Sequence, residues 1–327
     1  MGAFGGAVIL LRSTGGSPDQ AMAVFGVGLI GSALVDRLRS LRELDASFLP
    51  LGWHDPAERD RQLEEIRRRL AGPAGSGERA RRTFVWSAGR AGFSAGREDA
   101  ESELANFRAV LALYARCRED LPKAETRFVH FSSAGGLFEG QRHVDSKSVP
   151  RPRRPYGELK EAQEKLLLSA RIPALVVRLS SVYGCPRPGQ RAGLVSTLLF
   201  NGIRREVSSI FGSSDTLRDF VWVGDVAEFV ARLVTSGFDP AETRTILLAS
   251  GRPSSIFEVQ KIIEDVLGYK IYVSHSPVAS NRDDITFSRS ALPRDWSPGD
   301  LRANVGAVYR DAMRTGSALR HRALPGS

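Results

Sequence analysis

The chain has 327 residues, of which 42% are hydrophobic and 25% are charged, as is usual for a globular protein. This length is enough for one large domain or two modest ones. The two cysteines, Cys117 and Cys185, are too few for a disulfide framework or a metal site, so we expect no metal and a reducing, cytoplasmic compartment. We expect no membrane attachment, because no apolar run approaches the roughly 20 residues that cross a bilayer.

The net charge of +9 raises the question of a nucleic-acid partner. Only six of the 46 basic residues are lysines, and the arginine clusters at residues 67–69, 79–82 and 151–154 lie in different segments without interleaved aromatic residues. We interpret most of these arginines as solvated helix faces and loops. Attraction of a phosphate-bearing small substrate stays open, and we predict no nucleic-acid partner.

The N-terminal part of the chain contains a glycine motif between a predicted strand and a predicted helix. Residues 1–20 are rich in small residues, and we interpret them as a flexible extension with at most a short strand at 7–11. Residues 21–25 then predict a buried strand, and 32–41 have helical periodicity. The G-x-G-x-x-G motif between them runs from Gly26 through Gly28, Leu29 and Ile30 to Gly31.

Such glycines let the backbone turn tightly and approach a pyrophosphate at the N-terminus of the helix. We therefore favour dinucleotide binding by this loop over a merely tight turn. Residues 48–53 read as the next strand, after which an acidic residue favours NAD and a basic residue favours NADP. We predict NAD with Asp55 at the adenosine ribose, and NADP stays open with Arg59 or Arg61 at its 2′-phosphate.

Further strands and helices alternate along the chain. Strands are predicted at residues 83–87, 127–131 and 174–179, and helices at 59–70, 101–118 and 158–170. This alternation predicts an α/β protein with a doubly wound parallel sheet. Ligands of such sheets bind at the carboxyl ends of the strands, where Gly26, Ala88, Ser132, Ser133 and Tyr183 fall.

Tyr156 and Lys160 open the predicted helix that follows a proline-rich loop. Their spacing of four residues puts them on one helix face. An ammonium close to a phenol favours the ionised phenol, so the pair is a candidate general base. The alternative is an ordinary helix start with a packed tyrosine and a solvated lysine.

In their order and spacing, these motifs resemble those of the extended short-chain dehydrogenase/reductase family, the NAD-dependent epimerase/dehydratase group. Family chains carry a glycine loop, an alanine strand end, an asparagine in the next long helix, a serine pair and Pro-Tyr-Gly-x-x-Lys. The matching positions after the glycine loop are Ala88, Asn106, Ser132, Ser133 and 155–160. Residues 178–184 and 211–227 resemble later family motifs, and the resemblance covers roughly residues 21–290.

The resemblance implies a Rossmann domain at 21–180, with a returning segment near 217–250, and a smaller substrate-binding domain mainly at 181–327. It implies that Tyr156 takes a proton from a sugar hydroxyl while hydride passes to the nicotinamide. Lys160 supports Tyr156 and binds the nicotinamide ribose, and Ser133 bonds the reacting oxygen, with Ser132 as the alternative. Ala88, Asn106 and Ser132 are further cofactor contacts by resemblance, and the helices at 101–118 and 158–170 imply a homodimer.

Several departures from the family pattern narrow the reaction. Phe25 stands where the family's glycine loop usually has its first glycine, and 134–136 are Ala-Gly-Gly where dehydratases and decarboxylases carry acidic residues. Elimination of water needs an additional acid/base pair, so an epimerase or a ketoreductase remains. Ser181 replaces an asparagine near the substrate phosphates, while Arg218 matches an arginine that grips the diphosphate of nucleotide sugars. A salt bridge of Arg218 with Asp219 or Asp225 is the alternative.

The sequence therefore predicts an NAD-dependent epimerase or ketoreductase of a nucleotide-activated sugar. A reductase of a small ketone or secondary-metabolite intermediate, which Ser181 permits, is the second hypothesis. A cofactor-sensing protein without turnover is the third, and the retention of both Tyr156 and Lys160 disfavours it.

Overall fold

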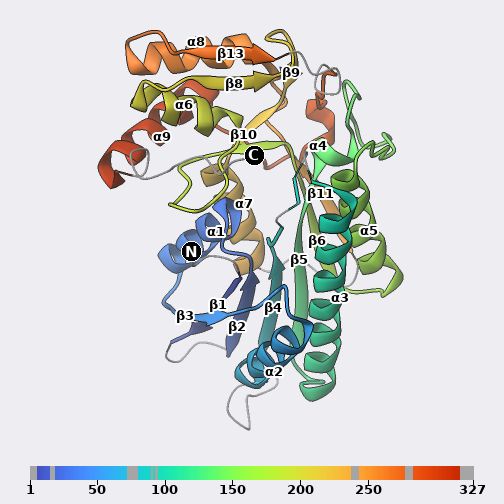
Figure 1. Ribbon diagram of the computed structural model, residues 1–327. Helices are drawn as coiled ribbons and strands as arrows, with labels where there is room; N and C mark the ends of the chain where they lie inside the picture. The colour runs from blue at the N-terminus through green and yellow to red at the C-terminus, as the bar shows by residue number, and fades with distance from the viewer. Residues whose placement is uncertain are drawn as a thin grey trace. The chain divides into compact units, whose positions relative to one another are not determined.

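A computed structural model describes residues 6–14, 19–71, 80–89, 91–92, 95–236, 243–276 and 283–316 (Figure 1). The chain divides into two compact units. The first unit comprises residues 1–132, 154–177 and 230–245, and the second comprises 133–153, 178–229 and 246–327. We expected a cofactor-binding domain at 21–180 and a substrate-binding domain mainly at 181–327. These two binding roles stay predictions.

A seven-stranded, mostly parallel sheet organises the first unit and confirms the expected α/β class. Its strands are β1 (Ala7–Ser13), β2 (Gln20–Phe25), β3 (Leu44–Pro50), β4 (Arg81–Trp86), β5 (Glu125–Ser133), β6 (Ala174–Leu179) and β11 (Arg244–Leu248). Their order across the sheet is β11-β6-β5-β4-β2-β1-β3. The strand expected at 174–179 has the predicted bounds. The bounds expected for the strand at 48–53 were wrong, because β3 runs from Leu44 to Pro50.

Within residues 1–20, which we interpreted as a flexible extension with at most a short strand at 7–11, the structure has that strand and extends it to Ser13. Residues 7–13 form β1, which pairs antiparallel with β2 on one side and with β3 on the other (Figure 1). Its centre, residues 8–11, is buried, and a strand covered on both faces reads as a continuous apolar run rather than an alternating one. The first unit thus has an antiparallel strand between the strand before the glycine loop and β3.

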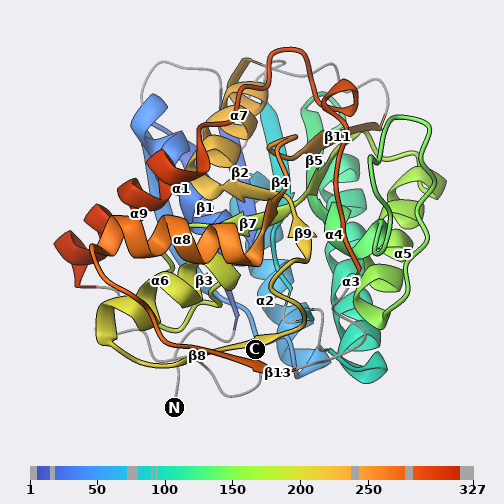
Figure 2. The ribbon, with the colours of Figure 1, turned by 90° about the horizontal axis from the view of Figure 1, so that it is seen from above.

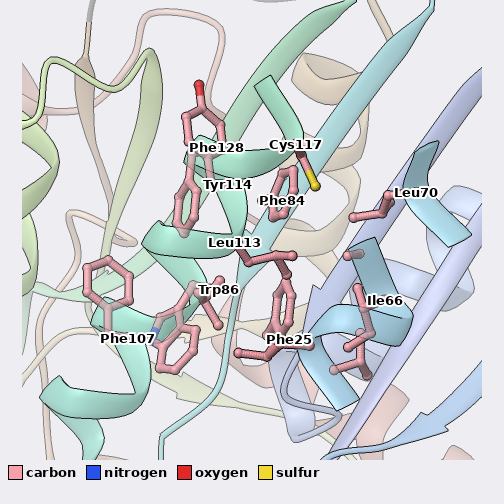
Figure 3. Packing of buried hydrophobic residues seen from close by; sticks show 14 of the residues in the cluster. Phe25, Ile66, Leu70, Phe84, Trp86, Phe107, Leu113, Tyr114, Cys117 and Phe128 are labelled. Atoms are coloured by element: carbon pink, nitrogen blue, oxygen red, sulfur yellow. The ribbon is translucent and has the colours of Figure 1, made fainter. Parts of the chain in front are cut away.

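Helices pack on the sheet through their apolar faces. The helices of this unit are α1 (Leu29–Leu41), α2 (Pro56–Ala71), α3 (Arg97–Asp120) and α5 (Pro155–Ser169), joined by the end of α7 (Val223–Ser236). A core cluster brings α2, α3 and α5 onto one face, where the Phe107 and Trp86 rings meet edge to face at 5.1 Å (Figure 3). Aromatic pairs of this kind add about 0.5–1.5 kcal/mol beyond their burial.

The second unit has its own apolar core. Its helices are α4 (Ala134–Leu137), α6 (Leu194–Arg204), α8 (Ile256–Leu267) and α9 (Leu301–Thr315), with a 3₁₀ turn η2 (Arg289–Ala291). Its short strands are β7 (Ser181–Tyr183), β8 (Ser208–Phe211), β9 (Leu217–Arg218), β10 (Phe220–Trp222), β12 (Ser254–Ser255) and β13 (Val273–Ser276). Buried residues of α6, α8 and α9 form one cluster, and Figure 2 shows these helices side by side. Among the described residues, none of the helices is both long and apolar enough to cross a membrane.

Candidate active site

The glycine loop follows β2 directly and turns because glycine occupies its tightest positions. Gly26 has a φ of +93°, and a Cβ atom there would lie 2.4 Å from the backbone of Ala88. At Gly31, a Cβ atom would lie 2.1 Å from the carbonyl oxygen of Gly26. Gly28 differs, because a Cβ atom there would meet nothing within 4 Å. Gly26 and Gly31 thus serve the turn, while Gly28 borders open space.

The Ser87 side chain fastens this loop to β4. Its hydroxyl group donates to the carbonyl oxygens of Gly26 at 2.8 Å and of Phe25 at 3.1 Å. Its backbone N–H also donates to Phe25 at 2.9 Å. Sequence reasoning placed Ser87 in a strand and missed this role, although a polar residue directly before Ala88 at a strand end was a usable signal.

The N-terminus of α1 fits a dinucleotide pyrophosphate. Gly28 is the N-cap, and no side chain caps this end of the helix. The N–H groups of the first turn, from Leu29 to Gly31, have no intrahelical acceptors by the geometry of an α-helix. The first turn holds no acidic residue, so the helix dipole and these donors favour an anion. The open space at Gly28 lets such a group approach the backbone.

Asp55, the expected ribose contact, caps α2. Its carboxylate accepts hydrogen bonds from the backbone N–H groups of Ala57 at 2.9 Å and Glu58 at 3.2 Å. The strand before it, β3, is separated from β2 by β1, which puts it two strand spacings, about 9.6 Å, from β2. Binding of the ribose by Asp55 stays a prediction, and the helix cap already occupies part of its acceptor capacity.

Asn106 and Arg59 lie together in the first unit. The Arg59 guanidinium donates to the Asn106 side-chain oxygen at 3.0 Å and pairs with Asp60 at 2.8 Å. Asn106 is buried on α3, so this bond connects α2 to α3. Two positions that the sequence assigned separately to cofactor binding, Asn106 for NAD and Arg59 for a 2′-phosphate, are thus joined in the structure.

Tyr156 and Lys160 lie on one face of α5, as their spacing predicts. Pro155 is the first residue of this helix, where its fixed φ and missing N–H cost nothing. The Lys160 ammonium lies 5.8 Å from the centre of the Tyr156 ring. Lys160 is only 5% exposed, which contradicts the alternative of a solvated lysine.

The Lys160 ammonium is held inside the first unit by two side chains. It donates to the Glu103 carboxylate at 3.3 Å and to the Gln163 side-chain oxygen at 3.2 Å. His130, on β5, is completely buried, and its ring packs 5.3 Å from that of Phe107. Burial and then the Lys160 charge hold the pKa of His130 well below its ordinary value. Sequence reasoning singled out none of these three partners.

The two serines at the end of β5 have different hydrogen bonds. The Ser132 hydroxyl donates to the Glu164 carboxylate at 2.6 Å. The Ser133 hydroxyl accepts from the backbone N–H of Gly136 at 3.1 Å and caps the short helix α4. An accepting hydroxyl keeps its own O–H for donation. The Ser132 hydrogen is thus committed to Glu164, and the role of Ser133 toward a substrate oxygen, with Ser132 as the alternative, stays a prediction.

In the second unit, Arg218 lies on β9, which pairs with β12, and Ser181 lies on β7, which pairs with β10. The Arg218 guanidinium donates to the carbonyl oxygens of Leu217 and Asp283. Asp219 accepts from the N–H groups of Ser250 at 2.7 Å and Gly251 at 2.8 Å. These bonds give Asp219 a structural role at the end of β11.

Asp225, the second acid considered as a salt-bridge partner of Arg218, also has hydrogen-bond partners of its own. Asp225 accepts from the N–H of Gly299 at 2.9 Å and from the Asn304 amide at 3.2 Å. Burial raises the pKa of Asp225, and that of Asp219 is also raised by burial. Within the described ranges, no three His, Cys, Asp or Glu side chains are grouped to hold a metal ion.

A family model described as "NAD dependent epimerase/dehydratase family" matches residues 77–248, slightly more than half of the 327 residues. The matched segment includes Tyr156, Lys160, both serines and Arg218, and it begins after the glycine loop. The family match therefore rests on motifs independent of Gly26–Gly31.

Two curated proteins and one solved structure illustrate the similarity. A Methanocaldococcus jannaschii protein named "Putative UDP-glucose 4-epimerase" is 29% identical over 160 residues, 46% of this chain and 51% of that protein. The GDP-6-deoxy-D-talose 4-dehydrogenase of Aggregatibacter actinomycetemcomitans is 25% identical over 205 residues, 59% of this chain and 68% of that protein. The chain thus spans about half to two thirds of these relatives. The UDP-glucose 4-epimerase of Thermus thermophilus in complex with NAD shares the fold, with 21% identity, a TM-score of 0.68, and coverage of 88% of this chain and 96% of that one.

Proposed function

The chain belongs to the NAD dependent epimerase/dehydratase family, and we propose that it is an enzyme that epimerises a ring hydroxyl of a nucleotide-activated sugar. Both curated relatives have names that refer to position 4 of a sugar attached to a nucleoside diphosphate. Position 4 is therefore the proposed reacting carbon. A hydroxyl at that carbon is inverted if it is oxidised to a ketone and then reduced from the opposite face.

The observation that carries the proposal is the buried Lys160 ammonium on the helix face of Tyr156. It lies 5.8 Å from the centre of the tyrosine ring, and Lys160 is among the buried residues of α5. A buried positive charge stabilises a developing phenolate more than a solvated one does. A protein that only sensed a cofactor would have no use for this arrangement.

In the proposed reaction Tyr156 accepts the proton of the sugar hydroxyl as the carbonyl forms, and it returns the proton when the carbonyl is reduced. Ser133 donates its O–H to the same sugar oxygen, because its hydroxyl accepts from Gly136 and keeps its hydrogen. Bound NAD supplies the hydride acceptor and returns the hydride. The glycine loop and the N-terminus of α1 hold the pyrophosphate of that cofactor.

The lack of an acidic side chain directly after Ser133 disfavours a dehydratase. The residues after Ser133 form α4, whose sequence is Ala-Gly-Gly-Leu. None of these side chains can act as the additional acid or base that elimination of water requires. The similarity to a 4-dehydrogenase favours one second candidate, an oxidoreductase that releases the oxidised or reduced sugar.

The test uses the purified full chain. We expect denaturation to release close to one NAD per chain, identified by mass spectrometry, because an epimerase regenerates its cofactor in every cycle. We expect NMR to show interconversion of the 4-epimers of a UDP-hexose without added cofactor. An empty site that binds added NADPH and reduces a 4-keto sugar nucleotide would replace the epimerase with the reductase.

Tyr156→Phe separates chemistry from binding. Loss of the phenol hydroxyl removes the proton acceptor, so turnover should fall by at least about 10³-fold. The affinity for NAD should change by less than about threefold, because the glycine loop still holds the pyrophosphate. Unchanged turnover in this variant would overturn the assignment of Tyr156 as the base.

A further inference from the structure

Glu103 has an unusual environment for an acidic residue of a long helix. It lies on α3 and is only 8% exposed. One carboxylate oxygen accepts from Lys160 at 3.3 Å and from the Gln163 side-chain amide at 3.4 Å. The other accepts from the backbone N–H of Ala91 at 3.2 Å. The carboxylate therefore connects α3, α5 and the segment that follows β4.

The three side chains form a closed buried set. Gln163 is completely buried, and it accepts from Lys160 at 3.2 Å while it donates to Glu103. The Gly89 backbone closes the set, because a Cβ atom there would lie 3.1 Å from the carboxylate. A buried ion is tolerated when it is paired and hydrogen-bonded, and leaving one partner alone is strongly unfavourable. Each charge of this pair therefore depends on the other.

We infer that Glu103 is a positioning residue for the catalytic Lys160, and this inference rests on the proposed function of the same helix face. The flexible lysine side chain would otherwise extend its ammonium toward water. Glu103 and Gln163 accept two of the three donors of the ammonium. These two bonds hold the ammonium 5.8 Å from the centre of the Tyr156 ring.

Two substitutions of Glu103 distinguish the effect of its charge from the effect of its size. Glu103→Gln keeps the size of the side chain and removes its charge, whereas Glu103→Asp keeps the charge and shortens the chain. If Glu103 acts by holding the ammonium, Asp retains more function than Gln. If it only fills space between α3 and α5, Gln retains more function than Asp.

Glu264 provides a matched control. It is a glutamate of α8 that is 6% exposed, and it pairs with Lys270 at 2.7 Å. Glu264→Gln therefore removes a buried carboxylate that pairs with an exposed lysine, on a helix other than those of Glu103 and Lys160. This control reports what the loss of such a pair does by itself to stability and turnover.

Two measurements on the full chain test the inference. Brief acetylation with acetic anhydride, read by mass spectrometry, reports how well the Lys160 amine is protected. We expect Glu103→Gln to raise acetylation of Lys160 at least about tenfold, because it frees a side chain that ion pairing had buried. Glu103→Asp and Glu264→Gln should leave Lys160 protected.

Kinetics with a UDP-hexose give the second measurement. We expect Glu103→Gln to lower kcat about 100-fold with little change in KM, because the phenolate loses its ammonium. Glu103→Asp should recover kcat to within about tenfold of wild type. In a Lys160→Met background, Glu103→Gln should have no further effect on kcat and should raise the Tm, because the paired charges are then both absent.

The outcomes distinguish this inference from the proposed function. Wild-type protection of Lys160 in Glu103→Gln overturns the inference, and so does a better performance of Gln than of Asp. A Glu103→Gln variant that turns over the sugar at the wild-type rate overturns it as well. If Lys160 is released in Glu103→Gln but the wild type turns over no nucleotide sugar, the positioning of Lys160 stands and the proposed function fails.

Discussion

Ser132 and Glu164 form a hydrogen bond of 2.6 Å in which the serine hydroxyl donates to the carboxylate. Both residues are buried, so the bond fixes the end of β5 to α5 in a water-poor environment. Ser133, the next residue, acts as an acceptor instead, because its hydroxyl oxygen accepts a hydrogen bond from the backbone N–H of Gly136. Two adjacent serines thus differ, because the hydrogen of Ser132 is committed to Glu164, whereas the described residues provide no acceptor for that of Ser133.

We predict that the two serine-to-alanine variants have different effects. Ser133→Ala should lower kcat by about 10²–10³-fold, as loss of one donor to a reacting oxygen does. Ser132→Ala should mainly lower the free energy of unfolding, by about 1–3 kcal/mol, because Glu164 loses a buried donor. Urea unfolding and steady-state kinetics of both variants check this prediction. Equal losses of kcat would contradict the division of roles between the two serines.

Gly28 allows cofactor binding to be tested without a change in the fold. Its φ of −76° and ψ of −168° suit any residue, and a Cβ atom there would meet nothing within 4 Å. Gly28→Ala should therefore fold with a change of less than about 1 kcal/mol. Its methyl group would occupy the space over the first turn of α1, so the NAD affinity should fall at least about tenfold if the pyrophosphate lies there.

Gly31→Ala is the matched comparison for Gly28→Ala. A Cβ atom at Gly31 would lie 2.1 Å from the Gly26 carbonyl oxygen, so this variant should lose stability as well as NAD affinity. Thermal unfolding and isothermal titration with NAD measure the two properties separately. Wild-type NAD affinity in a well-folded Gly28→Ala protein would show that the pyrophosphate does not approach this loop.

Arg218 is the residue expected to recognise the diphosphate of the substrate. Its guanidinium has several donors, of which one nitrogen bonds the carbonyl oxygens of Leu217 and Asp283. Arg218→Ala should weaken binding of a UDP-hexose by about 10–100-fold, because bidentate contacts to phosphate are among the strong charge-assisted bonds. Arg218→Lys should recover only part of this loss, since a lysine lacks the planar fork.

Titration calorimetry with a UDP-hexose and with NAD gives the measurement for Arg218. The NAD affinity of Arg218→Ala should stay within about threefold of wild type. Arg252, an exposed arginine of the same unit, provides the control for a general loss of positive charge. If Arg218→Ala binds a UDP-hexose as tightly as the wild type does, Arg218 does not contact the diphosphate.

The helices were predictable because their apolar periodicity and end signals agree. The helix predicted at 158–170 is α5 (Pro155–Ser169), and the structure adds a reason for its start in the proline at its first position. The turn at Gly26 was also predictable, because a φ of +93° against the Ala88 backbone leaves room only for glycine. Local rules were sufficient in both places.

The bounds of β1 and β3 were predicted less well, because the pairing of these strands is non-local. β3 is an edge strand whose Phe48 is 64% exposed, so the apolar run from Phe48 to Trp53 did not mark its bounds. β1 depends on pairing with two strands that follow it in the chain. Periodicity within a segment contains no information about which strands lie beside it.

Glu103 was missed because a single glutamate on a charged helix usually faces water. Only the structure shows that Lys160, fifty-seven positions later, supplies its counter-charge. The sequence therefore located Tyr156 and Lys160 on one helix face, because their spacing is local. The partners of Lys160, which are Glu103 and Gln163, and the partner of Ser132, which is Glu164, depend on packing between elements and were not predictable from spacing.

His130 gives a prediction about stability and pH. Among the described residues, neither ring nitrogen has a hydrogen-bond partner, and the side chain is completely buried. Burial, with a smaller contribution from the Lys160 charge, lowers the pKa of His130 well below 6.5, so the folded protein keeps the ring neutral. The unfolded chain binds a proton on this residue as the pH falls below about 6.5. The folded state should therefore lose stability toward acid.

Replacing His130 with leucine should remove this contribution. Between about pH 7.5 and about pH 5.5, the wild type should lose about 1.4 kcal/mol more unfolding free energy than His130→Leu. The variant should also be at least as stable near neutral pH, because leucine has a similar size and leaves no unpaired nitrogen. Urea unfolding at several pH values gives both quantities. The control is His275→Gln, at an exposed position, which should keep the wild-type pH dependence of stability. An unchanged pH dependence in His130→Leu would show that the buried ring is not the source of the acid sensitivity.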